Sequence, residues 1–243
     1  MIVDDFVMLR RTEPTESKKN GVAVCSAGYS RELRQLIRIY PLPWQNRIGS
    51  WTKCRIPLRR PRQDSREESW RIDGGETAED AVRAVEVLGT VNKDEEFSVL
   101  SRMTSRSIAW LNAQRKSLGI IKPKSMRGVF KRRDDVDPEE QLVLFDRLVA
   151  DGPTHKSDLI PQIEFSDDDG PHKLSLREWG CAEYLRKHRA NAEGLWGALN
   201  MNRADYEHLL LVGNQANARN AWLIIGLISR KKAAQQSLFD EAA

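Results

Sequence analysis

The sequence predicts an α+β protein built from two small β-barrel modules that are joined by a helical segment. Short apolar runs with the alternation of β-strands, separated by turn signals, fill the stretch before Gly74. Apolar residues then recur at helical spacing, and short strand-like runs return after Gly119. Many short strands with turns between them are typical of a small barrel rather than a helical bundle.

The N-terminal strands can be assigned in order. Phe6–Leu9 and Gly21–Cys25 are apolar runs on either side of a polar loop, which indicates a hairpin. Leu36–Tyr40 alternates apolar and polar residues, and we expect Pro41 to end that strand. Trp51–Leu58 alternates again. These four runs would form the first module.

The helical and C-terminal elements follow. The spacing of apolar residues predicts helices over Ala78–Leu88, Phe97–Ala113 and Arg177–Arg189. Leu209–Val212 and Ala221–Ile228 are short buried runs, which favour strands. The expected organisation is an N-terminal basic β module (1–75), a helical segment (76–116), a second β module with an inserted helix (117–230), and a flexible tail (231–243). The expected fold also includes a C-terminal helix.

Composition excludes several classes of protein. Hydrophobic residues make up 40% and charged residues 30% of the chain, and seven tryptophans argue for a folded core. No stretch approaches the roughly 20 apolar residues of a membrane helix, and the start lacks a leader pattern, so we expect a cytoplasmic protein without a membrane partner. The three cysteines are widely spaced, which fits buried thiols.

The positive charge is concentrated near the N-terminus. Residues 1–72 contain 15 Lys and Arg against 8 Asp and Glu. Arginine neutralises phosphates, and an exposed tryptophan offers a face for a base, so this pattern predicts nucleic-acid binding. The alternative is that the tryptophans belong to the core and the arginines form a solvated face. The predicted nucleic-acid contacts are Arg38, Trp51, Lys53, Arg55, Arg59, Arg60, Arg62, Arg66 and Trp70.

The C-terminal tail contains a second candidate. Residues 235–239 read Gln-Gln-Ser-Leu-Phe and resemble the peptide by which bacterial proteins bind the sliding clamp. In that motif Gln235 would make polar contacts, while Leu238 and Phe239 would fill an apolar pocket. The alternative is an apolar plug that folds back on the protein's own core.

The sequence contains no catalytic signature that we would assign. A Walker loop, a dinucleotide fingerprint, a nucleophile elbow and a Cys-x-x-Cys pair are all missing. We therefore name no catalytic residue, no metal ligand and no cofactor, and an enzyme is the less favoured reading. The carboxylates of Asp64, Glu67 and Glu68 leave open a magnesium-dependent nuclease. A protein–protein adaptor is the third alternative.

Six short segments lie in order along the chain, at residues 24–28, 38–41, 64–70, 117–123, 212–214 and 222–226. Together they resemble an uncharacterised bacterial family described as dual OB domain-containing proteins. Such a resemblance implies two oligonucleotide-binding-type (OB-like) barrels, and, by analogy of fold, nucleic-acid binding. Relatives carry a Cys and His knuckle before the final helix, whereas only His172 is present here.

We therefore predict a protein that binds single-stranded or structured DNA, in preference to RNA, without reading its sequence. Recruitment to the sliding clamp by the tail would place it in DNA repair, replication, or mobile-element and phage-defence processes. The sequence does not predict an oligomeric state.

Overall fold

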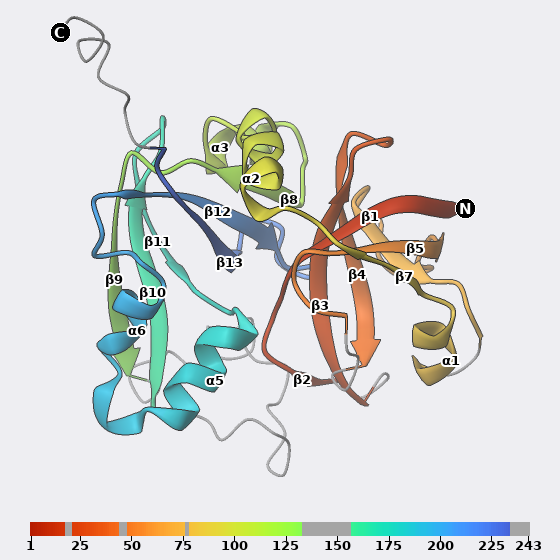
Figure 1. The fold of residues 1–243 in the computed structure, drawn as a ribbon, viewed down its shortest axis with the longest axis horizontal. Helices are drawn as coiled ribbons and strands as arrows, with labels where there is room; N and C mark the ends of the chain where they lie inside the picture. The colour runs from red at the N-terminus through yellow and green to blue at the C-terminus, as the bar shows by residue number, and fades with distance from the viewer. Residues whose placement is uncertain (18–20, 44–47, 76–77, 133–156, 234–243) are drawn as a thin grey trace, which may run out of the picture.

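The computed structural model describes residues 1–17, 21–43, 48–75, 78–132 and 157–233. Strands dominate these residues, and Figure 1 separates them into an N-terminal group on the right and a C-terminal group on the left. The strands are β1 (Ile2–Arg11), β2 (Thr15–Ser17), β3 (Gly21–Ser30), β4 (Gln35–Pro43), β5 (Thr52–Arg59), β6 (Ser69–Ile72), β7 (Glu86–Thr90), β8 (Leu118–Ile121), β9 (Ser125–Arg132), β10 (Leu159–Ser166), β11 (Pro171–Ser175), β12 (Tyr206–Asn214) and β13 (Trp222–Lys231). The helices are α1 (Ala78–Arg83), α2 (Lys93–Arg102), α3 (Ile108–Ala113), α5 (Trp179–Lys187), the 3-10 turn η2 (Arg189–Asn191) and α6 (Gly194–Ala198).

The N-terminal strands form a closed five-stranded barrel. Neighbouring strands follow the order β1, β3, β4, β6, β5, and β5 pairs back with β1 to close the ring. The pairing of β4 with β6 is parallel, and the other four pairings of the ring are antiparallel. Strand β6 pairs with β4 and with β5 through two residues each, so the ring is closed but parts of the edges of β4 and β5 stay unpaired by it; the result is an OB-like barrel.

Strand β5 illustrates how the sequence divides between core and surface. Its side chains alternate, so that Cys54, Ile56 and Leu58 are buried in the barrel while Arg55 and Arg59 are exposed. This is the period-2 pattern of a strand with one face on the core. The alternation that packs the barrel therefore also places arginines on its outer surface.

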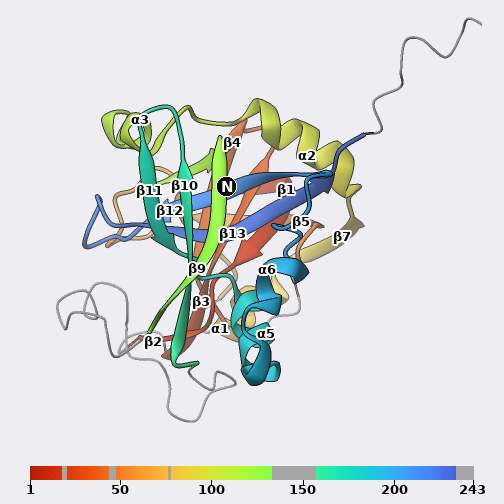
Figure 2. The ribbon, with the colours of Figure 1, turned by 90° about the vertical axis from the view of Figure 1, so that its left-hand side faces the viewer.

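The C-terminal strands form two three-stranded antiparallel sheets. One has the order β11, β10, β9 and the other β13, β12, β8, and Figure 2 shows β9–β11 in front of β12 and β13. Strands β8 and β9 are separated by residues 122–124 only. Leu176, just beyond β11, forms a parallel bridge with Ile224 of β13 and so connects the two sheets. Helices α5 and α6 lie in the connection from β11 to β12.

The two groups of strands share a hydrophobic core. Besides one cluster inside each group, a third cluster joins Leu9, Tyr29 and other residues of the first barrel to Phe97 of α2 and to the strands β8, β12 and β13. Tyr29 and Leu9 are fully buried in it. Burying such side chains contributes about 1.5–3 kcal/mol each, so the two groups are held together by core packing rather than by surface contacts alone.

Several predicted elements differ in the structure. Strand β4 continues through Pro41 to Pro43, because beyond Ile39 it pairs only with β3 and its other edge does not need a donor. The predicted helical segment 76–116 includes a strand, since α1 ends at Arg83 and β7 adds to the free edge of β5.

The helix predictions need two further corrections. The helix expected over 97–113 is interrupted, because the Ser107 hydroxyl accepts a hydrogen bond from the Trp110 amide and begins α3 as a separate helix. The helix expected over 177–189 is α5, and α6 follows it before β12; the described part of the chain then ends on strands β12 and β13 and not on the expected C-terminal helix. These strands and α5 confirm the predicted order of elements there. No helix of the described ranges is long and apolar enough to cross a membrane.

Candidate functional site

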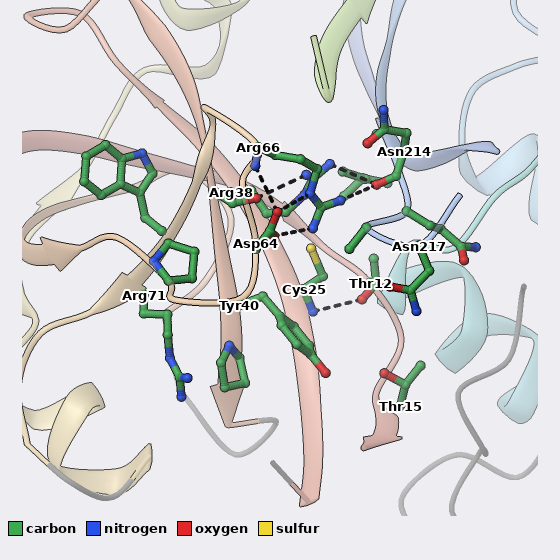
Figure 3. A pocket seen from close by; sticks show the side chains of 18 of the residues that line it. Thr12, Thr15, Cys25, Arg38, Tyr40, Asp64, Arg66, Arg71, Asn214 and Asn217 are labelled. Carbon is green, nitrogen blue, oxygen red and sulfur yellow. Dashed lines mark hydrogen bonds and ion pairs between the residues drawn. The ribbon is translucent and has the colours of Figure 1, made fainter. Parts of the chain in front are cut away.

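A cavity of about 850 Å³ lies between the first barrel and the loop that connects β12 to β13. The barrel contributes the end of β1, the β3–β4 surface, and the connection from β5 into β6. The opposite wall consists of residues 213–218, together with Leu223 and Ile225 of β13. Figure 3 shows side chains from both walls converging on its inner end. We call this cavity the cleft.

Arg38 occupies the inner end of the cleft and is almost fully buried. Its guanidinium donates to the Ser117 hydroxyl at 2.9 Å, to the Ser117 carbonyl at 2.6 Å and to the Asn214 carbonyl at 3.3 Å. Burial lowers the pKa of Arg38 to about 10, which leaves it charged at neutral pH. Arg38 therefore connects the C-terminal strands to the barrel, and a phosphate contact from Arg38, as the sequence predicts, would have to replace these hydrogen bonds.

Arg66 has a similar position beside Arg38. It binds Asp64 through Nη2 at 2.5 Å and through Nε at 2.8 Å, and it donates to the Asn214 carbonyl at 2.7 Å. Glu68 is also buried and accepts a hydrogen bond from the Ser117 hydroxyl at 2.7 Å. Two carboxylates thus balance the two inner guanidiniums, so Arg66 as well is occupied within the protein.

The outer part of the cleft contains the accessible cations. Arg59, Arg62 and Arg71 line it. Arg59 is 3.5 Å from Asp73, whereas the side chains of Arg62 and Arg71 make no hydrogen bond or ion pair with any other described residue. Surface pairs like that of Arg59 are weak, on the order of 0–1 kcal/mol. The outer cleft is therefore positively charged, with donors free to bind an anion.

Carboxylates do not offset this charge. The cleft is lined by six arginines and two carboxylates, and each carboxylate is paired within the protein: Asp64 with Arg66, and Glu13 with Arg177 at 2.5 Å. Low-dielectric walls around charges of one sign concentrate the field in such a cleft. An anionic chain would be attracted to it.

Trp70 lines the cleft but is only 7% exposed. The guanidinium carbon of Arg60 lies 3.7 Å from the centre of its ring, so that face of the indole is covered. Tyr40 is half-buried and lines the same cleft. The predicted free stacking face of Trp70 is therefore missing in the structure.

Four predicted residues do not line the cleft, namely Arg60, which covers Trp70, and Trp51, Lys53 and Arg55. Trp51 is 7% exposed, belongs to the core shared by the two groups of strands, and lies under the Arg10 guanidinium, so its ring is part of the core and does not face the cleft. Arg55 binds Asp4 at 2.8 Å. Lys53 is on the same strand, β5, and does not line the cleft.

The carboxylates considered for a metal do not converge. Asp64 binds Arg66, Glu67 is 3.1 Å from Lys116, and Glu68 faces Ser117. Within the described residues, His, Cys, Asp and Glu side chains form no group of three that could hold a metal ion. The clamp-binding prediction for Gln235, Leu238 and Phe239 falls outside the described residues.

Sequence reasoning missed part of the cleft. Tyr40, Arg177 and the loop 213–218 line it, although none of them belongs to the densest cationic stretch of the sequence, residues 53–71. Only the fold brings that loop to the barrel, through the hydrogen bonds of Arg38 and Arg66 to Asn214. Arg71 was part of the cationic stretch and does line the cleft.

Comparisons with known proteins add little on function. Residues 4–101 match the model of a family described as a domain of unknown function (DUF8758), a stretch that contains the first barrel with β7 and most of α2. No curated protein matches the chain. A chain from the solved structure titled "Crystal structure of the tetrameric p202 HIN2" aligns over 96% of this chain and 95% of its own length, with 9% identity and a TM-score of 0.29, which is too low to support an argument. The chain is thus similar, over its first barrel, to a family without an assigned function.

Proposed function

We propose that the protein binds single-stranded nucleic acid in the cleft, with DNA preferred over RNA, by phosphate contacts from Arg59, Arg62 and Arg71. The observation that carries this proposal is the set of arginines in the outer cleft, two of which have no partner among the described residues. Arginine is suited to phosphate because its planar group donates several hydrogen bonds and remains charged.

The place of the cleft on the barrel supports the proposal. OB folds bind oligonucleotides on the surface of their second and third strands and between the loops that follow the first and fourth strands. Counted around the first barrel, those strands are β3 and β4, and those loops are residues 12–20 and 60–68. The cleft is lined by Thr12, Cys25, Tyr40, residues 61–64 and Arg66. The cleft thus occupies the position at which OB folds commonly bind a single strand of nucleic acid.

The size of the cleft favours a single strand. Pockets that enclose small ligands measure roughly 300–1,000 Å³. A cavity of about 850 Å³ between two walls can take a few nucleotides of one strand, but it has no room for both strands of a duplex.

The C-terminal strands support a second OB-like barrel. If β8 and β9 are taken as one bent strand, the pairings run β9 with β10, β10 with β11, β11 with β13, β13 with β12, and β12 with β8. The contact near β11 and β13 is parallel, as is that of β4 and β6 in the first barrel. On this reading the cleft wall 213–218 begins the loop after the fourth strand of the second module.

The proposal is tested by fluorescence anisotropy with a labelled single strand at increasing salt. Three phosphate contacts on a single strand give a slope of log K against log salt of about −2, so affinity should fall roughly 20-fold between 50 and 200 mM salt. The double variant Arg62→Ala/Arg71→Ala should bind more weakly, and its loss over the same range should be only about 3-fold.

Arg55→Ala is the matched control, because Arg55 is an exposed arginine of the same barrel outside the cleft. It should leave both the affinity and the slope close to those of the unaltered protein. Binding that ignores salt, or an equal loss in the control and the double variant, would show that the cleft is not the interface. Competition by unlabelled RNA and duplex DNA tests the preference for single-stranded DNA.

Recruitment to the sliding clamp stays a separate prediction of the tail sequence. Deleting residues 235–239 should abolish co-purification with the clamp while leaving strand binding intact. Retained clamp binding by the deleted protein would refute it.

A further inference from the structure

Arg60 has an arrangement that differs from those of the other arginines near the cleft. Its guanidinium carbon lies 3.7 Å from the centre of the Trp70 ring, and its Nη1 donates to the carbonyl of Glu67 and, at 3.5 Å, to that of Ser69. One face of the group is therefore covered by the indole, and one of its nitrogens is held by the backbone. The residue as a whole is exposed.

Three other arginines that lie over rings bind carboxylates. Arg10 lies over Trp51 and binds Glu178 at 3.1 Å. Arg203 lies over Tyr206 and binds Asp205 at 2.7 Å, and Arg230 lies over Phe97 and binds Glu207 at 2.6 Å. Arg60 has no carboxylate partner in the described part of the chain. No described carboxylate therefore balances the charge of Arg60, and none lies against the face of its guanidinium that is turned away from Trp70.

We propose that a nucleobase stacks on the outward face of Arg60, which makes Arg60 and Trp70 together a base-binding subsite at the rim of the cleft. The planar guanidinium is a known platform for unpaired bases in single strands, and cation–π attraction adds to the stacking. This inference rests on the proposed function, since the same strand would place its phosphates on Arg59 and Arg62.

The position of Arg60 fits a base next to those phosphates. Arg60 does not line the cleft, but its neighbours Arg59 and Pro61 do, and so does the ring beneath it. A strand held by the outer arginines would therefore bring a base to the rim. The Trp70 ring and the two carbonyls fix the guanidinium beforehand, so little side-chain freedom is lost when a base binds.

This assignment exchanges the roles that the sequence predicted. Trp70 was expected to stack on a base and Arg60 to bind a phosphate. In the structure Trp70 is 7% exposed and serves as the support, while Arg60 offers the free planar face. Stacking needs the plane of the side chain, whereas phosphate binding needs its charge, and this difference allows the two roles to be separated.

The test compares two strands of equal length and labelling, one with ordinary bases and one in which every base is removed. The unaltered protein should bind the strand with bases more tightly, by about 5-fold or more for one stacked base. Arg60→Lys keeps the charge and loses the plane, so it should lose that preference while its affinity for the base-free strand and its salt dependence are unchanged. Arg60→Ala should lose the preference as well and also bind the base-free strand slightly more weakly.

The outcomes separate the two proposals. Equal binding of both strands by the unaltered protein, or an Arg60→Lys variant that keeps the preference, would overturn the stacking subsite and leave the phosphate contacts intact. An equal loss on both strands in Arg60→Lys would show that Arg60 contacts a phosphate. If the unaltered protein binds neither strand, both proposals fail. Identical urea unfolding midpoints for the variants exclude an effect on folding.

Discussion

Replacing Arg38 with leucine should destabilise the whole protein and not merely weaken binding. The guanidinium makes three hydrogen bonds shorter than 3.4 Å to Ser117 and Asn214, which lie on the far side of the cleft from the barrel. Its loss removes one of the two donors from each of the Ser117 and Asn214 carbonyls, which keep only the Asn214 N–H and the Arg66 guanidinium, and it leaves the buried Glu68 without one of its nearby cations. Breaking a buried charged network by removing one partner costs about 3–5 kcal/mol.

That cost is a large part of the roughly 5–15 kcal/mol by which a domain is stable. Urea unfolding followed by tryptophan fluorescence would measure it, because Trp51 and Trp70 in the barrel and Trp222 on β13 report on both sides of the cleft. The matched control is Arg62→Leu, an exposed arginine whose replacement should change stability by no more than about 0.5 kcal/mol.

The reasoning would be refuted if Arg38→Leu were as stable as the control and lost strand binding instead. Arg38 would then contact the ligand, as the sequence alone predicted. A variant that unfolds in two separate transitions would indicate that Arg38, and not the shared apolar core, couples the two groups of strands.

Two further predictions concern titration and reactivity. Partial burial alone would raise the pKa of Asp64, but its hydrogen bonds and ion pair with Arg66 lower it to about 2. Because the folded pKa is depressed, Asp64 should contribute stability above pH 4 that is lost as the pH falls toward 2, and solvent screening of this partly exposed pair limits that stability to about 1 kcal/mol. The difference in unfolding free energy between the unaltered protein and Asp64→Asn should therefore shrink over that range, and a pH-independent difference would contradict it. Cys25 is half-buried and lines the cleft, whereas burial raises the thiol pKa of Cys54 to about 11 and that of Cys181 as well. A thiol reagent should therefore modify Cys25 first, as measured by peptide mass spectrometry. Saturating single-stranded DNA should slow that reaction, and an unchanged rate would show that the DNA binds elsewhere.

Strands were predictable where the alternation of apolar and polar residues matched the alternation of buried and exposed side chains. The alternation in β5 identified its buried face, and the short apolar runs of β12 and β13 were assigned correctly. Local spacing was less informative where pairing decided the outcome. Leu88 fits a helical pattern with Val85, but the free edge of β5 draws residues 86–90 into a strand. Strand β4 could pass its prolines because one edge is unpaired there, which only the sheet order reveals.

The sequence predicted the positive charge of the candidate site, but not which of its arginines are paired within the protein. The cationic stretch does reach the cleft, through Arg59, Arg62 and Arg66. Whether an arginine is free depends on partners far along the chain, such as Ser117 and Asn214 for Arg38. The sequence also could not place Trp51, whose burial depends on packing against α2, β8 and β12.

The apolar cluster that joins the two groups of strands determines how the cleft can work. Its walls belong to one packed body, with fully buried Leu9, Tyr29, Leu209 and Leu211 behind them. Domains joined in this way have no hinge that could open and close around a ligand, because packed cores resist gradual deformation. The cleft is therefore a preformed slot of fixed width. A strand would enter it from the open side at little conformational cost to the protein, and selection among ligands would depend on their thickness and flexibility.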